Sequence, residues 1–289
     1  MDRYIGRDDP EEACRLAWQA GGGGEELRAG LALCALPERP RVLELGCGSG
    51  EFTALLLDAL PSATIIATDL NEQLLAAARA RLTAHAQASA RVRFERADAA
   101  RLPYPSRGFD LVACRCVLMH QADPAVAVAE MQRVADVGGY ALAIEPDWGA
   151  RAIYPDPEAL AALLDLARRA QPHGFPDLLL GRKLYALLRA AGFAPVRLRA
   201  TALVTTYDEQ PAGQPSEDHE GAAPLTSPAG PEGLLIQGRR LLRAAGLISD
   251  MELEDLMARL AALRRSQDYC SAGLDLVAVG QKSAPELTP

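Results

Sequence analysis

The sequence predicts an α/β fold built on a doubly wound, mostly parallel sheet of seven strands with helices on both faces. From about residue 41, short apolar or β-branched runs alternate with longer helical ones. The first of these units recur roughly every 25–30 residues, the rhythm of consecutive strand–helix units. The length of 289 residues suits one large domain with additions, so we expect a single core.

Seven segments have the composition of strands, at residues 41–45, 63–68, 92–96, 109–114, 140–144, 195–205 and 274–280. Helical patterns lie at residues 52–60, 72–86, 125–134, 234–245 and 250–265. Ser249 or Asp250 can cap the last helix. Helical sequence and a loop separate the last two strands, which leaves room for an antiparallel closing strand.

Several segments lie outside this rhythm. We expect residues 1–40 to form an N-terminal helical arm, with a helix near residues 11–20 and a flexible break at the glycine run 21–24. We expect the core at 41–146, a cap insertion at 147–180, and the rest of the core at 181–282, with a loop and helical insertion at 208–265. Residues 283–289 form a tail. The apolar stripes of the insertions fit either a lid over a pocket or a homodimer surface.

The charge and composition of the chain limit the classes of molecule that it is expected to bind. A net charge of −8 disfavours nucleic acid, which is bound through clustered Lys and Arg. No apolar run reaches membrane-spanning length, and the acidic N-terminus has no apolar signal region, which predicts a cytoplasmic protein without a membrane partner. The six cysteines show no C-x-x-C pair or Cys/His cluster, so neither a metal site nor a disulfide is expected.

Three glycines at alternate positions follow the first strand, in Gly46-x-Gly48-x-Gly50. Such a turn exposes backbone N–H groups to a nucleotide-like ligand. A dinucleotide is usually bound by G-x-G-x-x-G, and S-adenosylmethionine is the other common ligand. Because Glu44 and Glu51 flank the loop, a pyrophosphate would be repelled and a cationic sulfonium and ammonium favoured.

The run from Glu44 to Gly50 resembles motif I of the class I S-adenosylmethionine-dependent methyltransferases, which have a Rossmann-like fold. The resemblance implies that Asp69, after the second strand, holds the ribose hydroxyls, and that Asp98 and Ala99, after the third, read the adenine. Residues 109–112 and 137–140 resemble the fourth strand and the turn into the fifth. With Arg115 past strand four and Tyr4 in the arm, the expected cofactor-binding residues are Tyr4, Glu44, Gly46, Cys47, Gly48, Asp69, Leu70, Asp98, Ala99 and Arg115.

Residues 117–120, Val-Leu-Met-His, followed by Asp123-Pro124, are similar to the small-molecule branch of this family, which includes quinone-biosynthesis and natural-product enzymes. One departure is that residues 135–139 lack the Arg-Pro usually found before the glycines. The resemblance implies methyl transfer from S-adenosyl-L-methionine to O, N or C of a small organic molecule, in specialised metabolism. Three other hypotheses stay open: a non-methylating reaction that uses the bound sulfonium, a non-catalytic cofactor-binding protein, and an NAD-dependent dehydrogenase.

Residues that follow strands four and five are candidates for catalysis, because open α/β sheets bind their ligands at the carboxyl ends of the strands. His120 can act as a base and Glu145 can orient an acceptor. The candidate substrate-binding residues are Asp147, Trp148, Tyr154 and His173. Each has an alternative structural role, as a cap, a loop residue or a residue that positions the next helix.

Overall fold

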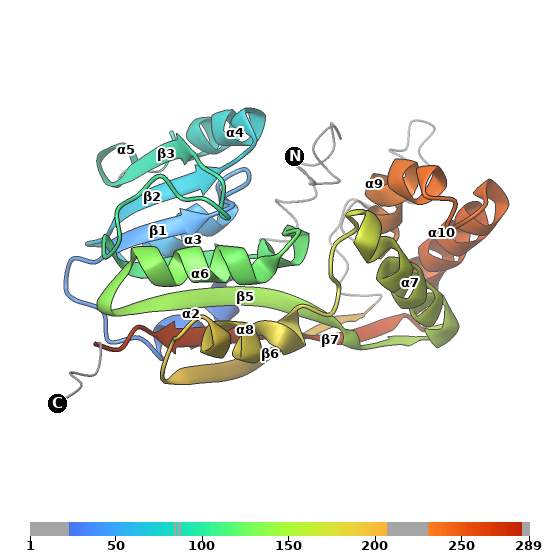
Figure 1. The fold of residues 1–289 in the computed structure, drawn as a ribbon. Helices are drawn as coiled ribbons and strands as arrows, with labels where there is room; N and C mark the ends of the chain where they lie inside the picture. The colour runs from blue at the N-terminus through green and yellow to red at the C-terminus, as the bar shows by residue number, and fades with distance from the viewer. Residues whose placement is uncertain (1–22, 84, 86–87, 207–230, 285–289) are drawn as a thin grey trace.

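The computed structural model describes residues 23–83, 85, 88–206 and 231–284. Its strands form one sheet in the order β3-β2-β1-β4-β5-β7-β6 (Figure 1). Strands β1 to β5 are parallel, and β7 is antiparallel to both of its neighbours, β5 and β6. The predicted α/β fold with a mostly parallel seven-stranded sheet is confirmed, as is an antiparallel closing strand.

The strands are β1 (Arg41–Leu45), β2 (Thr64–Asp69), β3 (Val92–Arg96), β4 (Phe109–Arg115), β5 (Ala135–Tyr154), β6 (Val196–Thr206) and β7 (Cys270–Gln281). The α-helices are α2 (Gly23–Leu31), α3 (Glu51–Ala59), α4 (Glu72–Leu82), α5 (Ala88–Arg91), α6 (Pro124–Val134), α7 (Pro157–Ala170), α8 (Leu184–Ala190), α9 (Pro231–Ala244) and α10 (Asp250–Arg265). Short 3₁₀ turns lie at η1 (Leu118–His120), η2 (Gln171–His173) and η3 (Gly181–Lys183).

The helix starts follow from local capping. Asn71 accepts hydrogen bonds from the backbone at the start of α4, and Asp123 does so for α6, whose first residue is Pro124. At α10, Ser249 and Glu252 form a capping box. These side chains explain why the predicted starts of α6 and α10 lie within one residue of the observed ones.

The fifth strand is longer than predicted. It continues past residue 144, with a bulge between Asp147 and Ala152, and pairs with β7 as far as Tyr154 opposite Cys270. Pro146 and Gly149 interrupt the apolar pattern, and such residues usually end a strand. Residues 147–154, expected in the cap, are therefore part of the sheet.

Helix α2 begins at Gly23, so Gly23 and Gly24 form its first turn, where the sequence predicted a flexible break. Gly23, Glu26, Leu27 and Gly30 are buried, the spacing of one helical face. A Cβ at Gly30 would lie 2.5 Å from a methyl carbon of Leu142, so glycine allows α2 to pack closely on the sheet. The predicted helix near residues 11–20 lies outside the described residues.

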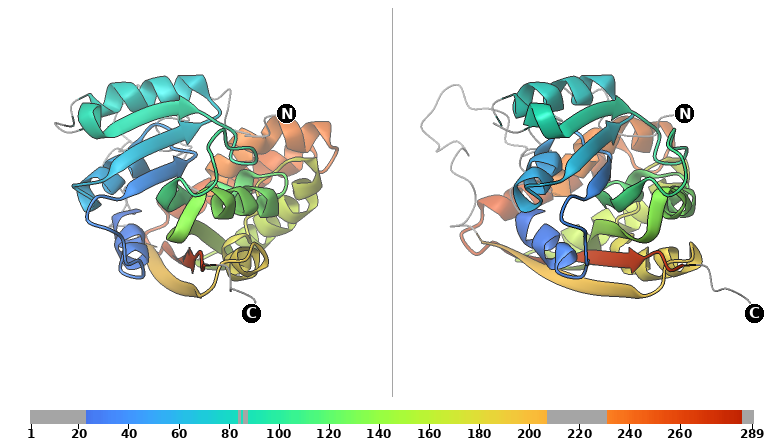
Figure 2. Two further views of the ribbon diagram at one scale, coloured as in Figure 1. Left: turned by 60° about the vertical axis from the view of Figure 1, so that its left-hand side comes forward. Right: turned by 90° about the vertical axis from the view of Figure 1, so that its left-hand side faces the viewer.

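Helices cover both faces of the sheet (Figure 2). Apolar side chains of α2, α3 and α4 pack in one core with the β1, β2 and β5 side chains that face them. Side chains of α6, α7, α8, α9 and α10 belong to a second, larger core on the other face. The cofactor-binding edge predicted from the sequence lies where the parallel strands end, between these two layers.

Helices α7, α9 and α10 pack against one another at one end of the sheet (Figure 1). Asp156 caps α7 and also accepts hydrogen bonds from Arg259 of α10 at 2.8–2.9 Å, which ties the two helices together. Leu160, Leu163 and Ala167 on the apolar stripe of α7 are buried within the chain. That stripe therefore packs inside the chain and is not available as a dimer surface. None of the described helices combines the length and the apolar character needed to cross a membrane.

Candidate cofactor and active site

The glycine loop follows β1 directly. Gly46, Gly48 and Gly50 have φ angles of +64°, +55° and +89°, in the left-handed region that strongly favours glycine. The N–H of Cys47 donates to the carbonyl oxygen of Thr68 at 2.8 Å, and the N–H of Gly50 donates to that of Cys47 at 2.9 Å. The loop is thus held against the end of β2 before α3 begins.

Two of these glycines also make close contacts. A Cβ at Gly46 would lie 2.5 Å from Cγ2 of Val117, which follows β4, and a Cβ at Gly50 would lie 3.1 Å from Cβ of Ala78 in α4. Glycine is therefore required by packing as well as by conformation. Val117 was not predicted as a site residue, because an apolar residue after a strand has no distinguishing signal.

Asp69 lies at the carboxyl end of β2, beside the glycine loop. Its Oδ2 accepts from the N–H of Gly48 at 3.0 Å, and its Oδ1 accepts from the N–H of Asn71 at 2.8 Å. The two bonds fix the carboxylate next to the exposed loop backbone. This is the position at which the sequence predicted a ribose-binding acid.

The two acids that flank the loop are less available than predicted. Glu44 is fully buried; one oxygen accepts from the hydroxyl of Thr53 at 2.7 Å, and burial raises its pKa to about 8. Glu51 forms an ion pair with Arg81. Because Glu44 is mostly protonated at pH 7 and Glu51 is neutralised, the predicted repulsion of a pyrophosphate is not supported. The choice of ligand then depends on Asp69 and the fold.

The other predicted cofactor-binding residues differ in their exposure to solvent. Asp98 is exposed after β3, and its Oδ1 accepts from the N–H of Ala100 at 2.9 Å, so it caps a turn. Ala99 is buried beside it. The Cys47 thiol is buried, which raises its pKa well above the ordinary value, so Cys47 contributes backbone and no thiolate. Tyr4 lies outside the described residues.

Glu145 supports the loop after β4. Its Oε1 accepts from the N–H groups of Val117 and Leu118 at 2.8 and 2.7 Å, at the start of η1, which carries His120. The side chain is fully buried, and its Oε2 has no hydrogen-bond partner. Burial, partly offset by these backbone hydrogen bonds, raises its pKa to about 8. In this arrangement Glu145 positions the backbone that carries Val117 and His120.

We expect Glu145→Gln to remove a pH dependence of stability. The folded-state pKa is about 8, above the unfolded value near 4.5, so the folded protein holds a proton that the unfolded chain loses. Stability from this group is full below about pH 4.5 and declines as the pH rises toward 8. Gln can still accept both N–H groups. Urea unfolding from pH 5 to 8 should show wild type losing roughly 1 kcal/mol per pH unit relative to the variant. Parallel curves would show that Glu145 is ionised in the folded protein.

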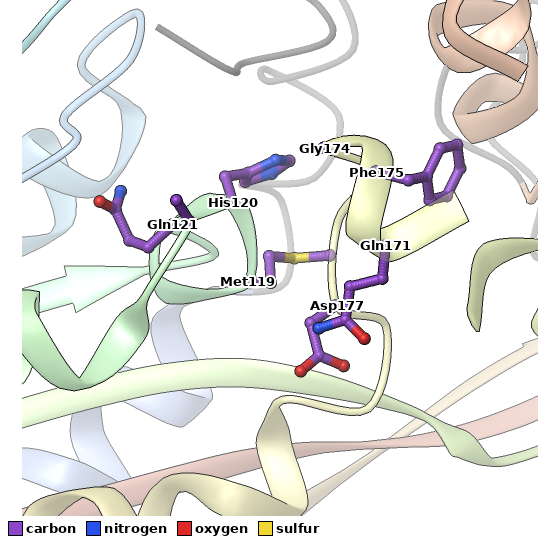
Figure 3. Close-up of a pocket in the computed structure, with 8 residues that line it drawn as sticks. Met119, His120, Gln121, Gln171, Gly174, Phe175 and Asp177 are labelled. Atoms are coloured by element: carbon purple, nitrogen blue, oxygen red, sulfur yellow. The ribbon is translucent and has the colours of Figure 1, made fainter. Parts of the chain in front are cut away.

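A small cavity lies between η1 and η2. Its volume is about 30 Å³, and its lining includes Met119, His120, Gln171, Phe175 and Asp177. Figure 3 shows the His120 imidazole directed toward the segment around Gly174. A space of this size holds a water molecule or two and no organic acceptor. His120 therefore lies at a polar gap in this conformation.

The four predicted substrate-binding residues are not brought together. The Asp147 carboxylate is buried, and both its oxygens accept from Arg182 at 2.8 Å. Arg151 lies over the Trp148 ring, 4.7 Å from its centroid. Tyr154 is 60% exposed at the far end of β5, and His173 is exposed in η2. Their roles in substrate binding stay predictions.

The chain was compared with known proteins. A family model described as a methyltransferase domain matches residues 43–143. The demethylmenaquinone methyltransferase of Deinococcus radiodurans is 39% identical over 119 residues, which are 41% of this chain and 48% of that protein. The enzyme of the same name from Roseiflexus castenholzii is 30% identical over 195 residues, which are 61% of this chain and 76% of that protein.

A solved structure supports the fold. An S-adenosylmethionine-dependent methyltransferase from Thermotoga maritima superposes with a TM-score of 0.56 at 17% identity, covering 98% of this chain and 100% of that one. The chain spans about half the length of several curated relatives that it matches. The sheet order, the glycine loop with Asp69 and these matches together show that the chain belongs to the class I S-adenosylmethionine-dependent methyltransferases.

Proposed function

We propose that the chain transfers the methyl group of S-adenosyl-L-methionine to a small organic molecule. The observation that carries this proposal is the Asp69 carboxylate, held by the N–H groups of Gly48 and Asn71 beside the bare glycine loop. An acid in this position can accept hydrogen bonds from both hydroxyls of a ribose. Membership of the family identifies S-adenosyl-L-methionine as the cofactor that such a site binds.

The residues at the edge fit this cofactor. Gly46 and Gly48 leave the loop free of side chains at positive φ, which allows a ligand to approach the backbone. Asp69 is only partly buried at this edge. Leu70, partly exposed at the same edge, offers apolar contact for the adenine. Ala99 is buried, and Asp98 caps a turn and must share its carboxylate to read the amino group.

The described residues supply binding and orientation. When bound, the cofactor provides a methyl group on a sulfonium, a good leaving group, so that holding the acceptor in line supplies most of the acceleration. Glu145 fixes the Val117–Leu118 backbone beside the loop. We propose that His120, at the next turn, lines the acceptor side of the site.

The acceptor is proposed from the relatives and the composition. Two relatives are named demethylmenaquinone methyltransferases, which favours a small organic acceptor over nucleic acid. The acidic net charge of −8 agrees with this. O, N and C remain open as the methylated atom, and specialised metabolism in the cytoplasm is the setting we propose.

We expect a methylated product when the purified chain is incubated with the cofactor and a panel of phenols, hydroquinones, amines and carboxylic acids. Mass spectrometry should show one hydrogen replaced by one methyl group, together with S-adenosylhomocysteine. Asp69→Ala serves as the control with weakened cofactor binding. A cofactor-dependent product without added methyl would indicate a non-methylating reaction, and tight binding without turnover across the panel would indicate a non-catalytic cofactor-binding protein.

A further inference from the structure

A buried carboxylate on α2 lies close to the proposed active site. Glu26 is fully buried, and both of its carboxylate oxygens lack a hydrogen-bond partner in the part of the chain that the structure describes. Burial of an unpaired ionised carboxylate costs several kcal/mol. A residue kept at such a cost is a candidate for contact with a ligand that supplies the missing donor.

The packing of α2 locates Glu26 above β7. A Cβ added at Gly30 would lie 2.5 Å from a methyl carbon of Leu142 in β5 and 3.1 Å from one of Val277 in β7. A Cβ added at Gly23, at the start of the helix, would lie 3.0 Å from Nε of Arg115. Glu26 is one turn from each and shares their face. It therefore lies over the segment of β7 between Val277 and the active-site edge, where Asp275 points to the same side as Val277.

Charged groups surround Glu26. Burial raises its pKa most and the backbone N–H of Glu26 itself lowers it; Asp275 and Glu25 raise it, while Arg115 lowers it. Asp275 is itself buried, which raises its pKa, while Arg115 and Arg151 lower it. With both acids ionised, the two carboxylates and the two guanidinium groups carry no net charge. A cationic ligand gains little here, and a neutral hydrogen-bond donor fits the unsatisfied oxygens of Glu26.

The distance of Asp275 from Asp69 and the glycine loop indicates that Glu26 lies on the acceptor side of the proposed site. Asp69 ends β2 and the glycine loop follows β1, whereas Asp275 lies on β7, three strands beyond β1 in the sheet. Strands lie about 4.8 Å apart, so Asp275 is roughly 14 Å from the end of β1 and roughly 19 Å from Asp69 on β2. A cofactor held at Asp69 and the glycine loop would occupy the part of this edge formed by β2 and β1. Glu26 then lies on the side from which an acceptor approaches.

We propose that Glu26 accepts a hydrogen bond, and then the proton, from a neutral hydroxyl group on the methyl acceptor. This rests on the proposed methyltransferase function. In the step, the acceptor oxygen forms a bond to the methyl carbon as the carbon–sulfur bond breaks, and the electron pair of that bond stays on sulfur. The hydroxyl proton passes to Glu26, so one positive and one negative charge are both neutralised.

Arg115 lies next to the start of α2 and near Glu26. Its side chain is partly buried and lies across the first turn of α2, where Gly23 leaves room for it. Rotation of this long side chain would open Glu26 to the carboxyl edge of the sheet. Replacing Gly23 would crowd the same guanidinium. In this proposal the hydroxyl group would reach Glu26 from the edge where β4 ends.

The first test uses stability and needs no acceptor. At pH 8, Glu26→Gln should raise the melting temperature of the whole chain by about 2–4 °C, since an amide is less costly to bury than a carboxylate. Glu25→Gln, at the exposed neighbour in the same turn, should leave it unchanged. A melting temperature of Glu26→Gln equal to or below that of wild type would show that Glu26 is held by a structural partner, and would overturn the proposal.

The second test uses activity and binding. Glu26→Gln should lower turnover of a hydroxyl acceptor at least 100-fold and remove the acid limb of the profile of kcat/KM against pH. The Kd for S-adenosylhomocysteine should stay within twofold of wild type. A tenfold weaker Kd would place Glu26 on the cofactor ammonium, and an acid limb lost in His120→Gln but kept in Glu26→Gln would make His120 the base. Either result would overturn the proposal.

A matched pair of probes tests the acceptor class. We expect methyl transfer from labelled cofactor to 2-naphthol and not to 2-naphthylamine, which differ only in the donor group. Methylation of the amine alone would contradict a hydroxyl acceptor. If wild type binds no S-adenosylhomocysteine, the proposed function itself fails, whereas the melting comparison of the Glu26 and Glu25 variants still reports on Glu26 by itself.

Discussion

Replacing Asp69 by Ala should weaken S-adenosylhomocysteine binding by about 2–3 kcal/mol, a rise in Kd of about 30- to 150-fold. Two charge-assisted hydrogen bonds to the ribose would be lost. In addition, the N–H groups of Gly48 and Asn71, now bonded to Asp69 at 3.0 and 2.8 Å, would lose their acceptor, which loosens the loop. Calorimetric titration of both proteins measures the difference.

A surface carboxylate provides the control for this experiment. Asp58 lies away from the edge and forms an exposed ion pair with His85, of the kind that contributes little. Asp58→Ala should bind S-adenosylhomocysteine as wild type does. Equal affinity of the Asp69→Ala protein and wild type would show that the ribose is not held at Asp69.

Gly46→Ala should be among the most damaging single substitutions in the chain. Its φ of +64° disfavours any side chain, and a Cβ would lie 2.5 Å from Cγ2 of Val117. The backbone conformation costs about 1–2 kcal/mol and the overlap about 1–3 kcal/mol more. Urea unfolding should show the combined loss, and titration should show weaker cofactor binding, because the loop must move away from Val117.

Gly246→Ala separates the two causes. Gly246 has nearly the same φ, +63°, and nothing within 4 Å of a Cβ, so its substitution should cost only the backbone contribution. Adding Val117→Ala to Gly46→Ala should recover part of the excess, which appears as a favourable coupling in a double-mutant cycle. If the two glycine variants lose the same stability, the contact with Val117 has no energetic role.

The parts of the fold that depend on local signals were predictable from the sequence. Strand β1 at Arg41–Leu45 and helix α10 at Asp250–Arg265 have the predicted bounds, since an apolar run and a capping box mark them. The end of β5 was missed because its pairing with β7, over more than 110 residues of sequence, keeps Asp147 and Tyr154 in the sheet. Long-range pairing of this kind has no local signal.

The site residues also divide into those with a local sequence signal and those that depend on long-range contacts. Asp69 and the glycine loop were predictable, because a motif and its position after a strand identify them. The partners of Asp147 and Glu145 were not: Arg182 lies 35 residues from the acid it binds, and Glu145 supports a loop 27 residues earlier. A polar residue beyond a strand can therefore be a candidate ligand in sequence and a structural support in the fold.

Asp275 stands at a position that weakly indicates its role, but the prediction from sequence did not include this residue. It interrupts the apolar run of β7, where an acid is unfavourable unless it is paired or functional. Glu26, in the segment expected to be an N-terminal arm and outside its predicted helix, had no such mark. Only the packing of α2 on the sheet brings Glu26 and Arg115 together near Asp275.

The central claim is that this edge binds S-adenosylmethionine and does not bind a dinucleotide. Calorimetric titration of the purified wild-type chain with S-adenosylhomocysteine and, separately, with NADH tests it most directly. We predict saturable, tight binding of S-adenosylhomocysteine and no heat of binding with NADH. Tight binding of NADH with none of S-adenosylhomocysteine would contradict the account.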